Sequence, residues 1–163
     1  MQFISMEEFI CSYPFDVKKY DVKIFKPEGE LAHENFPESR YAIDFRLPLG
    51  APVLAVKKGV VSLVRCDSDV YFSTSEVKDL TELEKRELAN RFTNVIGIRH
   101  NEIFTEYAHL AKNRVVSKNQ SVEEGEAIGY IDMSGITDIS HLHFNACKIE
   151  NKKGISIPVR FSE

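Results

Sequence analysis

The sequence has little of several features that mark common classes of protein. Acidic residues outnumber basic ones by 25 to 21, so no excess of positive charge favours nucleic acid as a partner. No apolar run approaches the ~20 residues of a membrane span, and residues 1–8 lack the basic and long apolar regions of a signal peptide. We therefore expect a chain that is cytoplasmic as synthesised and that binds a peptide, a sugar or another small ligand.

Cysteines are too few and too scattered to organise the fold. Cys11, Cys66 and Cys147 are odd in number and widely spaced, which fits neither a disulfide framework nor a C-x-x-C zinc site. The sequence also lacks an H-E-x-x-H motif, so no glutamate is available in that arrangement as a general base. We expect three ordinary thiols, and any acid–base chemistry has to come from other residues.

The sequence does have many short segments that alternate between apolar and polar residues. At 163 residues with 43% hydrophobic and 28% charged residues, the composition suits one globular domain. Turn residues separate the segments, and we expect strands near residues 22–25, 41–47, 52–56, 60–64, 94–99, 103–110, 127–131, 140–146 and 155–159. We interpret 52–64 and 115–131 as hairpins, and residues 6–11 as a short helix.

One segment has the pattern of a surface helix. Thr81 is followed three residues later by Glu84, which is the signature of a capping box, and charged residues fill one side of the segment that follows. Together with the strands, this pattern predicts an all-β antiparallel barrel or sandwich with one surface helix inserted at about residues 80–92.

The strand at residues 140–146 concentrates the chemistry of the chain. Successive side chains of a strand point to opposite faces, so His141 and His143 share one face while Leu142 and Phe144 share the other. Two imidazoles at this spacing can bind one metal ion, or one can bind it while the other handles protons. We expect a strand with a chemically active face and a buried face.

Five polar residues are candidates for a transition-metal site, each near a strand end or in a loop: His33, Asp44, His109, His141 and His143. Three nitrogen or oxygen ligands with an open fourth position make a catalytic zinc site, so five candidates compete for three places. The remaining histidine, His100, follows an alternating strand and precedes a turn. We expect it to be a surface residue or one that supports the site without binding the metal.

The order of these segments resembles the lysostaphin/LytM-type zinc metallopeptidases, which cut peptidoglycan cross-bridges or stem peptides. The matching segments are YAIDF at residues 41–45, PLGAPVLA at 48–55, GVV at 59–61, YAHL at 107–110, VEEGEAIG at 122–129, SG at 134–135 and HLHF at 141–144. They lie in about residues 33–150. The resemblance implies a metallopeptidase domain over residues 31–163, with residues 1–30 as an N-terminal extension packed on it.

The resemblance also implies roles for the five candidates. In that family an upstream histidine, the aspartate of the first strand and the second histidine of H-L-H bind zinc. Carried over, His33, Asp44 and His143 would hold one Zn²⁺ per chain, and His109 and His141 would occupy the catalytic positions. The commonest family pattern places its first histidine four residues before the aspartate, where this chain has Arg40, which cannot bind a metal. His33 would have to reach the site through its loop.

The implied activity is hydrolysis of amide bonds in peptidoglycan cross-links or stem peptides by a zinc endopeptidase. We also expect a monomer and, because no signal peptide is visible, action on the cell wall after delivery or release. His109 and His141 would handle protons, and we expect Tyr107, on the same strand face as His109, to orient it. Cys147 shares the face of the histidine pair but lies about 13 Å beyond His143, too far to bind the same ion.

Two other functions fit parts of the pattern. A catalytically inactive relative would keep the fold and bind a protein partner. A phosphocarrier-like barrel would use its histidine pair as a phosphate acceptor and would need no metal. The zinc content of the purified protein separates them, because about one zinc per chain favours the peptidase and none favours the others.

Overall fold

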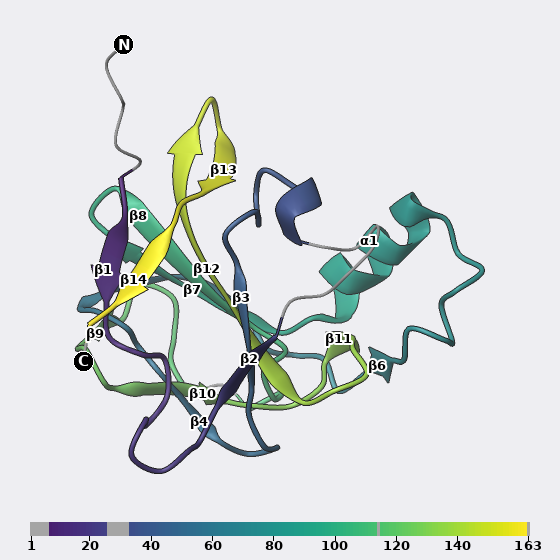
Figure 1. The fold of residues 1–163 in the computed structure, drawn as a ribbon, viewed down its shortest axis with the longest axis horizontal. Helices are drawn as coiled ribbons and strands as arrows, with labels where there is room; N and C mark the ends of the chain where they lie inside the picture. The colour runs from purple at the N-terminus through teal and green to yellow at the C-terminus, as the bar shows by residue number, and fades with distance from the viewer. Residues whose placement is uncertain (1–6, 26–32, 114, 163) are drawn as a thin grey trace.

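The computed structural model describes residues 7–25, 33–113 and 115–162, and it is built mainly from antiparallel strands (Figure 1). The main sheet has the strand order β2-β3-β12-β8-β7-β5-β9, and β13 pairs with the far end of β12. Its strands are β2 (Lys23–Phe25), β3 (Ile43–Arg46), β5 (Gly59–Arg65), β7 (Val95–His100), β8 (Ile103–Ala108), β9 (Ser121–Val122), β12 (His141–Glu150) and β13 (Lys153–Ser156).

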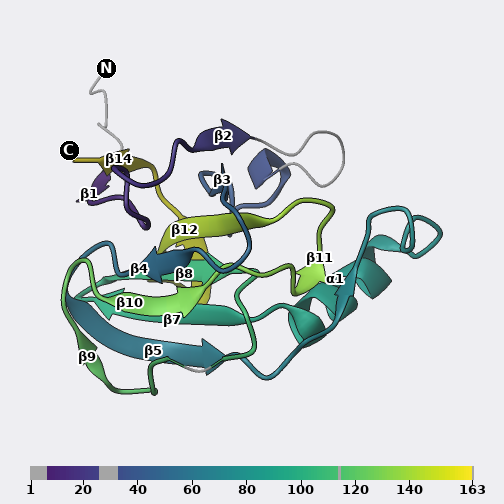
Figure 2. The same cartoon turned by 90° about the horizontal axis from the view of Figure 1, so that it is seen from below.

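Three smaller strand pairs surround the main sheet. They are β4 (Pro52–Leu54) with β10 (Ala127–Tyr130), β1 (Phe9–Cys11) with β14 (Val159–Phe161), and β6 (Tyr71–Phe72) with β11 (Gly135–Ile136). Figure 2 shows β4 and β10 next to the broad strands of the sheet, and their apolar residues belong to one core with those of β7, β8 and β12. The strands of the described residues form open, sandwich-like layers, so the all-β prediction is confirmed without a closed barrel.

The inserted helix is confirmed as α1 (Glu82–Phe92), and it lies at the outer end of the sheet (Figure 1). Thr81 accepts a hydrogen bond from the Glu84 backbone N–H, and the Glu84 side chain accepts one from the Thr81 N–H, which completes the capping box. None of the residues of α1 is buried. No helix in the described ranges has the length and apolar character needed to cross a membrane.

Several local predictions are wrong because strand pairing is decided at long range. Residues 9–11 form β1 rather than a helix, since they pair in parallel with β14 at the other end of the chain; Met6 lies outside the described residues. The two expected hairpins also do not form: β4 pairs with β10, and β5 pairs with β7 and β9. The predicted strand at 155–159 is divided into β13 and β14 at Pro158, which has no N–H for a strand ladder.

Candidate active site

Three neighbouring strands bring the candidate residues together. In the register of β12, His143 lies opposite Asp44 of β3 on one side and Ala108 of β8 on the other, and His141 lies opposite Arg46. Directly opposite residues project to the same face of a sheet. Leu142 is fully buried in the core behind them. The predicted strand with one apolar face and one histidine face is therefore confirmed.

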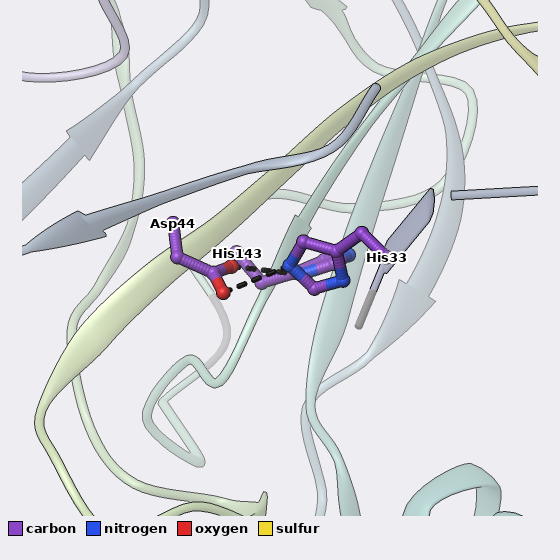
Figure 3. A group of neighbouring side chains, drawn as sticks. All are labelled: His33, Asp44 and His143. Carbon is purple, nitrogen blue, oxygen red and sulfur yellow. Dashed lines mark hydrogen bonds and ion pairs between the residues drawn. The ribbon is translucent and has the colours of Figure 1, made fainter. Parts of the chain in front are cut away.

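The Asp44 carboxylate faces two imidazoles, those of His33 and His143, whose ring centroids are 4.7 Å apart (Figure 3). His33 Nε2 is 2.8 Å from Asp44 Oδ2, and His143 Nδ1 is 3.0 Å from Asp44 Oδ1. One ligand atom from each of the three residues lies within 4.8 Å of the other two, so the group could hold a metal ion. Two imidazole nitrogens and a carboxylate oxygen are a donor set that zinc accepts.

Asp44 is only 2% exposed, yet it remains an anion. Burial by itself would raise the pKa of this carboxyl group, but the hydrogen bonds from His143 and His33 outweigh burial and hold its pKa below the ordinary value. A buried carboxylate needs compensating positive charge or hydrogen-bond donors. The two histidines supply donors here, and a bound cation at the same nitrogens would replace their protons.

His109 reaches the site through an unusual backbone conformation. It follows the end of β8 with φ 66°, in the left-handed region that few residues other than glycine adopt. Regular alternation would have turned His109 to the core side with Tyr107, whereas its ring lies 4.4 Å from that of His141 and 6.3 Å from that of His143, measured between centroids. The prediction that His109 and Tyr107 share a face is therefore wrong.

Tyr107 does not orient His109 as expected. Its hydroxyl accepts hydrogen bonds from the Val56 N–H and from the Thr105 hydroxyl, inside the core. His109 is instead held by the Ser134 carbonyl, which lies 2.7 Å from its Nδ1. The Ser134 hydroxyl in turn accepts from the Asn94 N–H and donates to the Leu110 carbonyl. Ser134, which the sequence indicated only as part of a segment that matches the family, positions the ring.

His141 is oriented by the turn that precedes its strand. Its Nδ1 lies 2.8 Å from the carbonyl oxygen of Ile139, and the Thr137 hydroxyl donates to the same oxygen. Phe25 of β2 packs against the ring of His141, with 5.1 Å between centroids and 74° between the ring planes. His141 Nε2 lies 3.9 Å from Asp44 Oδ1. Both Thr137 and Phe25 were missed by the sequence reasoning, because neither lies in a recognisable motif.

Both histidines of this pair are held in the neutral state with a defined tautomer. Burial, followed by the proximity of His141, lowers the pKa of His109 to about 3, and burial also lowers the pKa of His141. A carbonyl oxygen can only accept, so Nδ1 of each ring carries the proton that faces Ser134 or Ile139. The lone pair of each neutral ring is consequently at Nε2.

The loop that carries His33 is fastened to the sheet by a buried polar network. Asn145 of β12 donates from Nδ2 to the Glu38 carbonyl at 2.7 Å, and its Oδ1 accepts from the Ser156 hydroxyl at 2.8 Å. Ser156 Oγ also accepts from the Tyr41 N–H. The loop includes a 3₁₀ turn, η2 (His33–Asn35), which presents His33 to Asp44, whereas Arg40 is exposed. Asn145 and Ser156 were not recognised from the sequence.

The remaining histidine and the cysteines do not join the cluster. His100 is buried rather than at the surface, with Nδ1 2.8 Å from the Lys58 carbonyl and Nε2 2.8 Å from Thr105 Oγ1. Cys11, Cys66 and Cys147 are buried and form no disulfide with one another. Burial raises the pKa of Cys11 and of Cys147 to about 12, so both stay protonated at neutral pH and would be poor metal ligands.

Comparisons with solved structures show the same fold. A zinc-containing peptidase from Vibrio cholerae has 22% identity and a TM-score of 0.58 over 93% of this chain, which spans only 39% of that protein. The catalytic domain of the antimicrobial peptidase lysostaphin from Staphylococcus simulans has 20% identity and a TM-score of 0.55, covering 85% of this chain and 90% of that one.

A third structure is a variant of the catalytic domain of the prophage-encoded M23 protein EnpA from Enterococcus faecalis. It has 17% identity and a TM-score of 0.53, covering 96% of this chain and 92% of that chain. No curated protein sequence matches the chain. The profile of Peptidase family M23 matches residues 38–156, which include Asp44, His109, His141 and His143 but not His33. Because this match covers most of the sequence, the chain belongs to Peptidase family M23.

Proposed function

We propose that the protein is a zinc-dependent endopeptidase that hydrolyses amide bonds in peptidoglycan cross-links or stem peptides. The observation that carries the proposal is the arrangement around Asp44: a buried carboxylate hydrogen-bonded to both His33 and His143, with two further histidine rings beside them. Membership of a peptidase family and the resemblance to lysostaphin/LytM-type enzymes support the reaction class and the substrate class.

In this proposal His33 through Nε2, Asp44 through a carboxylate oxygen and His143 through Nδ1 hold one zinc ion per chain. These two nitrogens lie 2.8 and 3.0 Å from the carboxylate oxygens of Asp44, and one ligand atom of each residue lies within 4.8 Å of the others. When bound, zinc would act as a Lewis acid toward the scissile carbonyl and lower the pKa of a water molecule. The family profile does not include His33, so its role rests on its 2.8 Å contact with Asp44.

His109 and His141 handle the protons of the reaction. Each ring is neutral and directs an unprotonated Nε2 away from the carbonyl that holds its Nδ1, so either can accept a proton from the attacking water. A ring that has accepted this proton becomes a donor. It can then stabilise negative charge at the former carbonyl oxygen or protonate the leaving amine. The two carbonyls keep the tautomers in place through the cycle.

The alternative functions fit the arrangement less well. A phosphocarrier-like barrel needs one reactive histidine and has no use for a buried carboxylate bonded to two imidazoles. An inactive module that only binds a partner has no need for defined tautomers at His109 and His141. We propose that the protein acts as a monomer, and that it reaches the cell wall after delivery or release.

Metal analysis of purified variants tests the assignment of ligands. We expect His33→Ala, Asp44→Ala and His143→Ala to lose zinc, and His109→Ala and His141→Ala to keep it. Arg40→Ala is the control for His33→Ala because it lies in the same loop but is exposed. Tight zinc binding by His143→Ala would contradict the ligand set, and loss of zinc from Glu34→Ala or Glu38→Ala instead of His33→Ala would place a carboxylate in the site.

Digestion of purified peptidoglycan with mass analysis of the fragments tests the activity. The expected result is release of fragments cut at one kind of amide bond, lost on chelation and restored by zinc. His109→Ala and His141→Ala should bind zinc and cut at least about 100-fold more slowly, the usual contribution of general acid–base catalysis. A zinc-loaded wild-type protein that releases no fragment would contradict the proposal and favour the partner-binding alternative.

A further inference from the structure

Two basic side chains lie directly opposite each other beside the candidate active site. Lys23 of β2 and Arg46 of β3 are register partners, and Arg46 is also the partner of His141 on its other side. Directly opposite residues project to the same face of a sheet, so all three side chains lie on the face that carries Asp44. Lys23 and Arg46 are both exposed.

These two cations have no carboxylate within 4 Å among the described residues of the chain. Like charges directly opposite each other destabilise a sheet, so nothing in the folding of β2 and β3 accounts for the pair. The expected arrangement for stability alone would place an acidic or neutral residue at one of the two positions. The pair therefore calls for an explanation in binding.

The same side chains line a pocket of about 360 Å³ together with Asp21, Pro48 and Ser140. Its charged groups are two cations and one carboxylate, so the pocket has a net positive charge. The Ser140 hydroxyl already donates to the Leu47 carbonyl. Lys23 and Arg46 are thus the side chains with donors to offer an anion in this pocket.

The pocket adjoins the reacting groups. Arg46 is two residues from Asp44 along β3, a distance of about 7 Å, and lies opposite His141. Phe25, two residues after Lys23 on the same strand, packs on the His141 ring, and Ser140, which lines the pocket, directly precedes His141. An extended peptide advances about 3.3 Å per residue, so a group held by Arg46 lies one or two residues from the bond that reacts.

We propose that Lys23 and Arg46 form a subsite for a carboxylate of the peptide substrate, one or two residues from the scissile bond on the His141 side. The guanidinium of Arg46 presents a planar pair of donors that matches a carboxylate, and Lys23 adds a second positive charge. This inference rests on the proposed peptidase function and specifies its substrate: the enzyme prefers a peptide with a free carboxylate next to the cleavage site.

A comparison of two forms of one substrate tests the subsite. Soluble peptidoglycan fragments are used with their carboxylates free or converted to carboxamides. We expect the wild-type zinc enzyme to cleave the free form with a kcat/KM about tenfold higher, the lower end for a charged hydrogen bond because Arg46 is exposed. Arg46→Gln should remove this preference mainly through KM, because the contact is made equally in the ground state and the transition state.

Variants define the contribution of each cation. Arg46→Lys should retain part of the preference, and Lys23→Gln should lose less of it than Arg46→Gln. Arg99→Gln is the matched control, since Arg99 is an exposed strand arginine of β7, three strands away from β3 in the sheet. Cleavage of the carboxamide form should be nearly unchanged in all of them. If Arg46→Gln loses cleavage of the free and the carboxamide forms equally, Arg46 has a structural role. If it loses cleavage of neither form, the pocket binds no carboxylate. Either result overturns the inference.

Binding measured on chelator-treated protein separates the subsite from the activity. The expected result is tighter binding of the free form by wild type and equal binding of both forms by Arg46→Gln. If this preference is found but no fragment is ever cut, the proposed function fails while the subsite stands. If fragments are cut but wild type shows no preference in either assay, the subsite is refuted while the proposed function stands.

Discussion

Removing the Asn145 side chain should weaken zinc binding although Asn145 is not a proposed ligand. Asn145 is 2% exposed, and its amide joins β12 to the loop of His33 through the Glu38 carbonyl and to β13 through Ser156. Asn145→Ala deletes both hydrogen bonds. Each of these hydrogen bonds contributes about 1 kcal/mol, and the Ser156 hydroxyl that loses its acceptor adds a further cost. The free energy of unfolding should therefore fall by about 2–3 kcal/mol.

Part of this loss acts on the position of His33. The bond from Asn145 to the Glu38 carbonyl is the one that reaches the loop directly. If this bond's contribution of about 1 kcal/mol to anchoring the loop is lost, the fraction of molecules with His33 in place falls, and the apparent zinc affinity falls by up to about fivefold. Competition titration with a chromophoric chelator measures the affinity, and urea unfolding of the metal-free protein measures the stability.

Thr105→Val is the matched control for Asn145→Ala. Thr105 is fully buried on the core side of β8, where its hydroxyl contacts His100 and Tyr107 rather than the loop. It should lose a similar free energy of unfolding and leave zinc affinity unchanged. Equal zinc affinities in the two variants would refute the reasoning, because they would show that the loop keeps its position without Asn145.

Three further changes should have distinct effects. In metal-free protein, the pKa of His109 is about 3 in the folded state against about 6.5 in the unfolded state, so the stability that neutral His109 contributes is complete above pH 6.5 and is lost as the pH falls. Urea unfolding should show that wild type loses about 2 kcal/mol more stability between pH 7 and pH 5 than His109→Gln does. An equal loss in the two proteins would contradict the burial argument. Gly135→Ala should lower stability by more than about 2 kcal/mol in thermal unfolding, because an added Cβ at φ +91° would lie 2.1 Å from Thr93 Oγ1. Gly50→Ala is the control: at φ +82° with open space around the added Cβ, it measures the backbone strain without the clash. The Arg86 guanidinium of α1 lies 5.3 Å from the Phe36 ring centroid in the His33 loop. Arg86→Ala should therefore change which peptidoglycan fragments are released, while stability falls by less than about 1 kcal/mol. Arg91 contacts Phe92 of its own helix, so Arg91→Ala is the control and should leave the fragments unchanged.

The all-β class, the surface helix and the two faces of the histidine strand could be read from the sequence because each depends on local rules. The Thr81 and Glu84 capping box needs only residues three apart, and the faces of His141 and Leu142 follow from the two-residue period of a strand. Four members of the candidate set, His33, His109, His141 and His143, could be named because the chain has only five histidines, and Asp44 because it lies in the YAIDF segment that resembles the family pattern.

Tertiary structure alone decided which strands pair and how the site is held. Turn residues in the sequence show where strands end, but pairing of β4 with β10 and of β1 with β14 depends on contacts between distant segments that share one core. The same holds for His109, whose positive φ turns it away from Tyr107 and toward His141 against the strand period. Its partner, the Ser134 carbonyl, is a backbone group that every residue possesses, so residue identity carries no signal for it. Long-range backbone contacts, which the sequence does not mark, thus convert five candidate residues into one site.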